Sequence, residues 1–223
     1  MIESIRNKKE NEVGGKMYKF ISGLLHLIIM KLSKSLEVQG KEHIPQLHRY
    51  VVTCTHESYN EVIMLATAIY PNQTHYMAKK ELFDNKWFGK FLTSLNAFPV
   101  DRENPGPSTL KKPIKLLKEN KTVGIFPTGH RMKYNEGAPM KRGAVTIALM
   151  AEAPILPAAY VGPKEIKGLV TGNAIVKFGE PIETKNLSKN MKRNEKLEYL
   201  TSELEKRTIQ LQNELNSYVN SKK

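Results

Sequence analysis

Apolar and polar positions fall into blocks along the chain, and the blocks have the lengths of strands and helices. Apolar runs of strand type lie at residues 50–54, 122–126 and 155–161, each close to polar or turn-forming residues. Apolar residues recur at helical spacing in residues 62–70 and 143–151, after two of these runs. Strands that alternate with helices predict a single α/β domain, with a central, largely parallel or mixed sheet flanked by helices.

The amino-terminal segment is apolar in its middle and basic at its edges. Residues 20–30 carry no formal charge, and Lys16, Lys19, Lys31 and Lys34 flank them. This run is shorter than the roughly 17–25 residues that span a bilayer. We therefore expect an amphipathic helix that lies in the headgroup region of an anionic membrane. A helix buried against the domain fits the same pattern, and one helix can do both.

These patterns divide the chain into three regions. A leader and membrane-associating helical segment occupies residues 1–45, the α/β domain residues 46–185, and a carboxyl-terminal helix residues 186–223. An apolar seam in the last region either covers the domain or pairs two copies of the chain, so the sequence leaves the oligomeric state open. The seam consists of Leu197, Leu200, Leu204, Leu211 and Leu215.

Composition narrows the class of partner. The chain has 223 residues, 40% of them hydrophobic and 26% charged, which is ordinary for one globular domain. The formal net charge of +13 and the pI of about 9.6 predict an anionic partner: nucleic acid, anionic lipid or an acidic carrier protein. The basic stretches carry no recognisable nucleic-acid motif, so we rank nucleic acid last.

We expect no metal and no bound cofactor. The sequence has no Cys/His metal spacing, no Walker phosphate loop and no dinucleotide-binding glycine pattern. Its one cysteine, Cys54, lies in an apolar strand and leaves no intrachain disulfide. A reducing compartment fits this composition.

The best candidate for chemistry is His56, at the turn that follows the apolar run of residues 50–54. Open α/β sheets bind ligands at the carboxyl ends of strands, and histidine suits proton transfer near neutral pH. Glu61 follows five residues later, where a helical pattern begins. On one ideal helix the two side chains would be about 140° apart. They meet only if His56 lies in the loop and Glu61 in the first helical turn.

In that geometry Glu61 holds one ring nitrogen of His56 and raises the basicity of the other. The simpler interpretation is that His56 caps the helix and that Glu61 is a solvated acid favoured by the helix dipole. For this pair taken alone the simpler interpretation is favoured, and motifs further along the chain reverse that balance.

A second candidate site follows the strand at residues 122–126. Pro127 and Gly129 force a turn there and let the backbone approach a ligand. Backbone N–H groups and the guanidinium of Arg131 make a phosphate cradle at the end of the strand. Arg131 is our first choice for a phosphate ligand, the alternative being a surface cation. His130 is either a second polar contact or a structural hydrogen-bonding group.

Four segments, in this order and spacing, resemble the motifs of the glycerolipid acyltransferase family. They are residues 56–61, 98–102, 125–131 and 155–160, and the resemblance extends over residues 50–179. The family's motifs are His-x-x-x-x-Asp, an Asp-Arg pair, Phe-Pro-Glu-Gly-Thr-Arg and an apolar strand that contains proline. One such motif is weak support, whereas four in order are strong support.

The resemblance implies an O-acyltransferase that moves a fatty acyl group from an acyl thioester to the sn-2 hydroxyl of lysophosphatidic acid, giving phosphatidic acid. It implies that His56 deprotonates the hydroxyl and that Glu61 orients His56. The implied donor is acyl carrier protein or acyl-CoA, both anionic, and no cofactor is required. The residues implied to bind the acceptor phosphate are Arg131, Gly129, Thr128 and Arg102.

The chain departs from the family's motifs at three positions. Glu61 replaces an aspartate, Thr128 a glutamate and His130 a threonine. A glutamate still orients a histidine, whereas the changes at Thr128 and His130 bear on the identity of the acceptor. Two alternatives therefore stay open: an acyltransferase for another lysophospholipid acceptor, and a non-catalytic lipid-binding membrane protein.

Aromatic residues gather in the helical pattern of residues 87–92, at Trp87, Phe88 and Phe91. Core packing is the favoured interpretation, and the alternative is that they line an acyl-chain tunnel or contact lipid. The amino-terminal segment and the positive charge lead us to expect a peripheral protein on the cytoplasmic face of the cell membrane.

Overall fold

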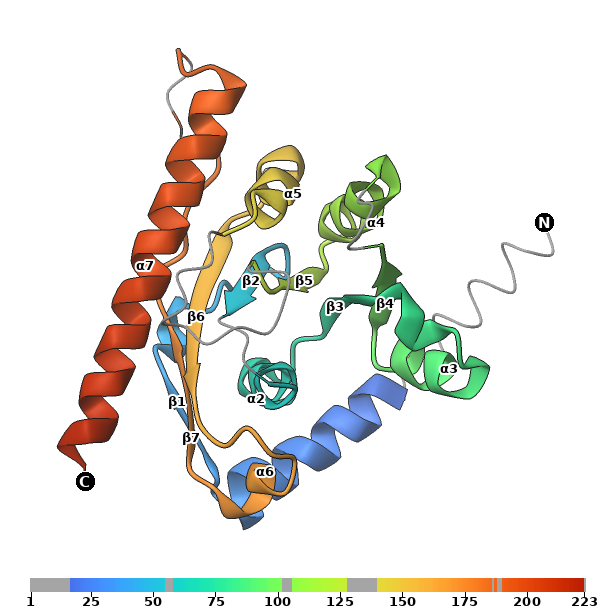
Figure 1. Ribbon diagram of the computed structural model, residues 1–223, viewed down its shortest axis with the longest axis vertical. Coiled ribbons are helices and arrows are strands. Elements are labelled where there is room, and N and C mark those ends of the chain that lie inside the picture. Colours follow the sequence, from blue (N-terminus) through green and yellow to red (C-terminus); the bar gives the residue numbers. More distant parts are fainter. Residues whose placement is uncertain are drawn as a thin grey trace.

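The computed structural model describes residues 17–54, 58–101, 106–127, 140–185, 187 and 190–222, in which strands and helices alternate (Figure 1). The strands are β1 (Leu36–Gln39), β2 (Val51–Cys54), β3 (Thr74–Lys79), β4 (Ala97–Val100), β5 (Thr122–Ile125), β6 (Ile155–Val161) and β7 (Ala174–Phe178). The α-helices are α2 (Asn60–Ile69), α3 (Lys86–Ser94), α4 (Pro107–Lys118), α5 (Gly143–Ala151), α6 (Gly168–Thr171) and α7 (Arg193–Ser221). Short helical turns are η1 (Leu27–Leu32), η2 (Lys41–His43) and η3 (Lys80–Phe83). Residues 17–26 are α-helical and run into η1, and we call residues 17–32 the amino-terminal helix.

The seven described strands form one sheet in the order β1-β7-β6-β2-β5-β3-β4. All neighbouring strands run parallel except β6 and β7, which run antiparallel. The predicted single α/β domain with a largely parallel or mixed sheet is therefore confirmed. Because β2, β5, β3 and β4 are parallel neighbours, their carboxyl ends meet at one edge of the sheet.

Helices cover both faces of the sheet. Successive side chains of a strand point to opposite faces, and β2 follows this rule. Val52 and Cys54 pack with α2 and the amino-terminal helix, whereas Val51 packs with α4, α5 and α7. Figure 1 shows these two groups of helices on opposite sides of the strands. The central strand is thus buried on both faces, which explains its apolar sequence.

The amino-terminal helix has one face on the domain and one face exposed. Tyr18 and Ile29 are buried, and the Tyr18 hydroxyl accepts the Thr74 N–H at 3.2 Å. Phe20 and Leu32 are 71% and 72% exposed. The packing of one helix face against the domain is therefore confirmed, and the contact of the other face with a membrane stays a prediction. Of the helices in the described part of the chain, none is long and apolar enough to cross a membrane.

Helix α7 lies along the sheet beside β6. Leu200, Leu204, Leu211 and Leu215 of the predicted seam are all buried, between 0% and 7% exposed. They pack on the two core clusters that contain Ile155 and Ala159 of β6. The seam therefore covers the domain, as one of the two alternatives predicted.

Candidate active site

The predicted catalytic and phosphate-binding segments follow strands whose carboxyl ends share one edge of the sheet. Residue 56 comes two positions after the end of β2, residue 102 two positions after β4, and residues 128–131 shortly after β5. The topology thus brings the ends of the strands that precede these three motifs to one edge of the sheet. The following residues themselves lie outside the described part of the chain: His56, Arg102, Thr128, Gly129, His130 and Arg131.

Glu61 lies in the first turn of α2, as the pairing with a loop histidine requires, and it is only 2% exposed. The Ser58 N–H donates to both carboxylate oxygens at 2.9 Å, and the Ser58 hydroxyl donates to Oε2 at 2.8 Å. Burying a carboxylate is costly unless hydrogen bonds compensate, and these three bonds do so. The alternative of a solvated first-turn acid is wrong for Glu61.

The sequence motifs did not identify Ser58 as the residue that holds Glu61. A signal for it exists in the sequence, since Ser58 and Glu61 are spaced as Ser-x-x-Glu, the pattern of a capping box. The glutamate accepts the serine's backbone N–H, as in that box, and the Ser58 hydroxyl accepts the Asn60 N–H at 3.1 Å, so these contacts position the carboxylate as well as the helix start.

A second missed residue, Asn60, fixes the loop after β6 to the start of α2. Its Nδ2 donates to the carbonyls of Pro163 and Glu165 at 2.7 and 2.8 Å. The Tyr160 hydroxyl donates to the same Pro163 carbonyl at 3.0 Å. Burial, with the negative charge of Glu61, raises the pKa of Tyr160 well above its usual range, so the phenol stays a donor. Hydrogen bonds therefore join the loop, strand β6 and the Glu61 turn.

An apolar cavity of about 510 Å³ lies at the same edge, under α4 and α5 and against the ends of β3, β4 and β5. This volume is in the range of small-molecule sites, roughly 300–1,000 Å³. An elongated hydrocarbon such as an acyl chain suits a lining of this chemistry. The apolar lining residues are Met77, Val100, Leu110, Ile125, Phe126 and Ile147.

Polar and charged groups stand at the rim of the cavity. Asp101 lines it and pairs with Lys80, whose Nζ is 2.5 Å from Oδ2. Lys141 also lines it, and its N–H donates to the Pro127 carbonyl at 3.0 Å, which brings together the chain on either side of residues 128–139. A lysine and an ion pair thus flank an apolar cavity. Across the described ranges, no group of three or more His, Cys, Asp or Glu side chains is placed to hold a metal ion.

The aromatic residues of α3 do not belong to this cavity. Trp87, Phe88 and Phe91 are 85%, 45% and 48% exposed, and none of them lines it. The prediction that they pack in the core is wrong, because α3 buries only Gly89 fully, against η3. Their side chains instead form an exposed apolar face.

A buried carboxylate and an acyl-sized cavity at the carboxyl edge of an α/β sheet suit an enzyme that handles acyl chains. The Acyltransferase family model matches residues 35–161, and the chain belongs to this family. It is 48% identical to the 1-acyl-sn-glycerol-3-phosphate acyltransferase of Bacillus subtilis, covering 89% of this chain and 98% of that relative. It is 33% identical to the protein of the same name from Streptococcus pneumoniae, covering 100% of this chain and 83% of that relative.

A solved structure supports the fold. The chain matches the crystal structure of the 1-acyl-sn-glycerophosphate (LPA) acyltransferase from Thermotoga maritima with a TM-score of 0.62. The two are 20% identical, and the match covers 87% of this chain and 81% of that one.

Proposed function

We propose that this protein transfers a fatty acyl group from an acyl thioester to the sn-2 hydroxyl of lysophosphatidic acid, giving phosphatidic acid. The observation that carries the proposal is the 48% identity to a 1-acyl-sn-glycerol-3-phosphate acyltransferase over 98% of that relative's length. In such an acceptor the sn-1 position is acylated and the sn-3 position is phosphorylated. The sn-2 hydroxyl is therefore the remaining nucleophile.

In the proposed reaction His56 takes the proton of that hydroxyl while its oxygen attacks the thioester carbonyl. A C–O bond forms, the C–S bond breaks, and the proton passes from His56 to the departing thiolate. Glu61 orients His56 and stabilises the imidazolium, for which its three hydrogen bonds to Ser58 prepare it. The thioester is already activated, so the reaction needs neither a covalent acyl-enzyme nor a cofactor.

We assign the acceptor phosphate to Arg131, the backbone around Gly129, Thr128 and Arg102. The support is their position after β5 and β4, at the edge of the sheet that also carries Glu61. The apolar cavity holds an acyl chain of one of the substrates. The donor is acyl carrier protein or acyl-CoA, and the net charge of +13 suits either anion.

The protein would meet its lipid substrate as a peripheral protein on an anionic membrane. Phe20 of the amino-terminal helix and Trp87 of α3 are among the most exposed large apolar side chains. The two helices approach each other, because Lys19 and Asn96, which follows the end of α3, line one pocket. Exposed apolar side chains beside lysines suit binding in the headgroup region. We place this surface on the cytoplasmic face of the cell membrane.

An acceptor panel tests the proposed substrate. The purified protein is given one acyl-CoA or acyl carrier protein donor with lysophosphatidic acid, and in parallel with lysophospholipids that carry larger headgroups. We expect phosphatidic acid as the main product in mass spectra. Preferred acylation of a headgroup-bearing lysolipid would show that lysophosphatidic acid is not the preferred acceptor, while the acyl-transfer reaction would stand.

A further inference from the structure

A second pocket lies at the opposite edge of the sheet, where β3 and β5 begin. Glu61 instead follows the carboxyl end of β2. Its volume is about 450 Å³. We call it the amino-edge pocket. It is lined by Lys19, His48, Pro71, Asn72, Gln73, His75, Asn96, Asn120 and Lys121.

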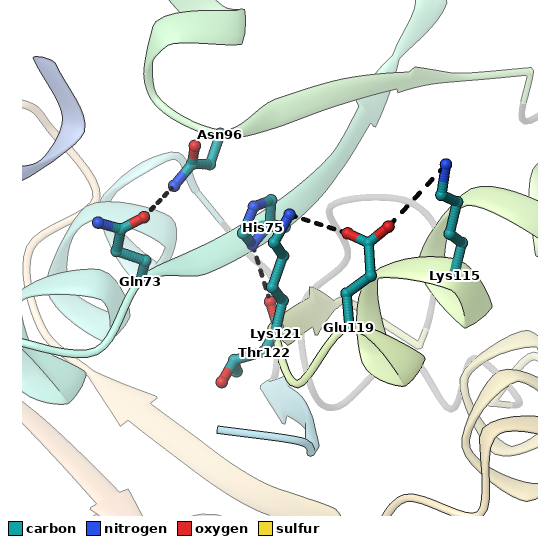
Figure 2. A network of polar contacts seen from close by, with 7 residues as sticks. All are labelled: Gln73, His75, Asn96, Lys115, Glu119, Lys121 and Thr122. Carbon is teal, nitrogen blue, oxygen red and sulfur yellow. Dashed lines mark hydrogen bonds and ion pairs between the residues drawn. The ribbon is translucent and has the colours of Figure 1, made fainter. Parts of the chain in front are cut away.

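The lining of the amino-edge pocket is rich in hydrogen-bond donors. It combines two lysines and two histidines with four carboxamides, and it includes no carboxylate. Each carboxamide nitrogen and each ammonium group can donate to an anion. In Figure 2, Asn96 Nδ2 donates to Gln73 Oε1 at 3.4 Å, which turns the Gln73 nitrogen away from Asn96 as a further donor.

His75 is held in place within this lining. Its Nδ1 lies 3.3 Å from the Thr122 carbonyl, and this contact fixes the ring (Figure 2). Burial, together with the charges of Lys121 and Lys112, lowers the pKa of His75 to about 4, so the ring is neutral at pH 7. The ring is therefore a local reporter for any anion that enters the pocket.

Two features at this edge oppose an anion, and the lysines must outweigh them. The carboxyl ends of α3 and α4 lie here, and helix dipoles place partial negative charge at such ends. Glu119 is also near, although Lys121 contacts its carboxylate at 2.9 Å and Lys115 at 3.9 Å. The Glu119 charge is thus shared between two lysines (Figure 2). Lys19 supplies a further cation from another helix.

The position of Lys19 connects the pocket to the exposed face of the amino-terminal helix. Its neighbour Tyr18 is buried against Thr74 at the start of β3, and its other neighbour Phe20 is 71% exposed. Leu24 and Leu27 continue that exposed side. An anion held at Lys19 therefore sits where a polar pocket borders an apolar helix face.

We propose that the amino-edge pocket binds the phosphate group of an anionic membrane phospholipid whose acyl chains lie along Phe20 and Leu24. A soluble phosphate would contact the donors of the pocket but not the exposed apolar side of the amino-terminal helix. A membrane lipid contacts the donors through its phosphate and the apolar side through its acyl chains. The proposal rests on the membrane contact proposed above, and it adds a lipid site separate from the acyl-transfer site.

The test is a titration of the full-length protein, followed through the histidine ring resonances in NMR spectra. Short-chain phosphatidylglycerol is the probe, since it is neither the proposed substrate nor the product. Short-chain phosphatidylcholine and inorganic phosphate are the comparisons. A His75→Gln variant assigns the His75 signal. We expect the His75 resonance to shift with phosphatidylglycerol at concentrations about tenfold below those needed with either comparison, because charge-assisted contacts and apolar contacts act together.

Matched variants separate the pocket from general electrostatics. Lys19→Ala should weaken phosphatidylglycerol binding about tenfold, and the uncharged change Gln73→Leu about threefold. Lys31→Ala removes the same charge from the same helix outside the pocket and should change binding by less than about twofold. Equal losses for Lys19→Ala and Lys31→Ala, an unshifted His75, or equal binding of inorganic phosphate would overturn the proposal. Acylation of lysophosphatidic acid in detergent, measured on the same variants, reports on the proposed function independently.

Discussion

Ser58 donates to both carboxylate oxygens of Glu61, from its backbone N–H at 2.9 Å and from its hydroxyl at 2.8 Å. Ser58 lies before α2 and Glu61 lies in its first turn. The same three contacts therefore define where the helix starts and where the carboxylate points. A carboxylate held in this way before substrate binds is ready to orient a neighbouring base without further ordering.

Glu61→Gln should lower kcat about 10²-fold or more, because the side chain keeps its size but loses the charge that stabilises the imidazolium. The KM for lysophosphatidic acid should change little, since Glu61 does not contact the acceptor in this account. Steady-state kinetics, with a thermal unfolding curve for each variant, measure both effects.

A milder variant and a surface control accompany that change. Ser58→Ala removes the hydroxyl's contacts with Glu61 and with the Asn60 N–H but keeps the backbone N–H bonds to Glu61, and it should lower kcat roughly threefold to tenfold, in keeping with one hydrogen bond to a charged group. Glu165→Gln alters an exposed carboxylate that pairs with Lys167 at 2.9 Å, and it should leave kcat unchanged. A folded Glu61→Gln enzyme with the kcat of the wild type would refute the role of Glu61.

Gly143→Leu should narrow the apolar cavity without disturbing the fold. Gly143 lines the cavity at the start of α5, and a Cβ added there meets nothing within 4 Å. Leucine also favours helix over glycine by roughly 0.5–1 kcal/mol. We expect the ratio of kcat/KM for a long-chain over a short-chain acyl thioester to fall about tenfold, the effect of losing one to two buried methylene contacts.

Gly143→Ala is the control for helix propensity and should keep the chain-length preference of the wild type. If Gly143→Leu raised the melting temperature and left chain-length preference unchanged, the cavity would not be the acyl site.

Phe20→Ser and Trp87→Ser should each weaken binding to anionic vesicles about tenfold, since each removes an apolar side chain that would be buried in lipid. The two side chains are 71% and 85% exposed, so the fold should tolerate both changes. Vesicle sedimentation measures the effect. Ile209→Ser, on the outer face of α7 and 42% exposed, is the control. Equal binding by the wild type and the three variants would show that this surface does not contact the membrane.

His75 makes part of the stability depend on pH. Burial, with the charge of Lys121, lowers its pKa from 6.5 to about 4. His75 therefore binds a proton more readily in the unfolded chain than in the folded one. The contribution of His75 to stability is lost as the pH falls from about 6.5 to about 4. Across that window the loss is roughly 3 kcal/mol.

Denaturant unfolding at several pH values, for wild type and His75→Gln, isolates this contribution. The wild-type protein should lose stability relative to the variant as the pH falls through that window. A difference between the two proteins that stays constant from pH 7 to pH 4 would show that His75 is not buried as a neutral ring.

The fold class could be predicted from the sequence because the length and periodicity of each apolar run distinguished strands from helices. The run at residues 50–54 predicted a strand, and β2 is that strand, buried on both faces. The leucine seam left two partners open, and only the tertiary packing shows Leu200 and Leu204 against the domain. The antiparallel β6–β7 pair also depends on long-range pairing that no local pattern encodes.

The candidate site was predictable in its motifs and less so in its environment. Spacing placed Glu61 in a first helical turn, but spacing alone favoured a solvated acid, and burial depends on the loop that Asn60 ties down. The prediction for the aromatic residues of α3 was wrong because apolar composition is the same for a helix face in the core and for an exposed one. Whether another element packs against Trp87 depends on the whole fold and not on the local sequence.

The most direct test of the central claim compares the wild type with His56→Ala, given lysophosphatidic acid with acyl-CoA or acyl carrier protein. Mass spectrometry of the lipids measures phosphatidic acid formed over time. We expect phosphatidic acid from the wild type and a rate at least about 10²-fold lower from a folded His56→Ala protein. Equal rates from the two proteins, or no acylated product from the wild type with either donor, would contradict it.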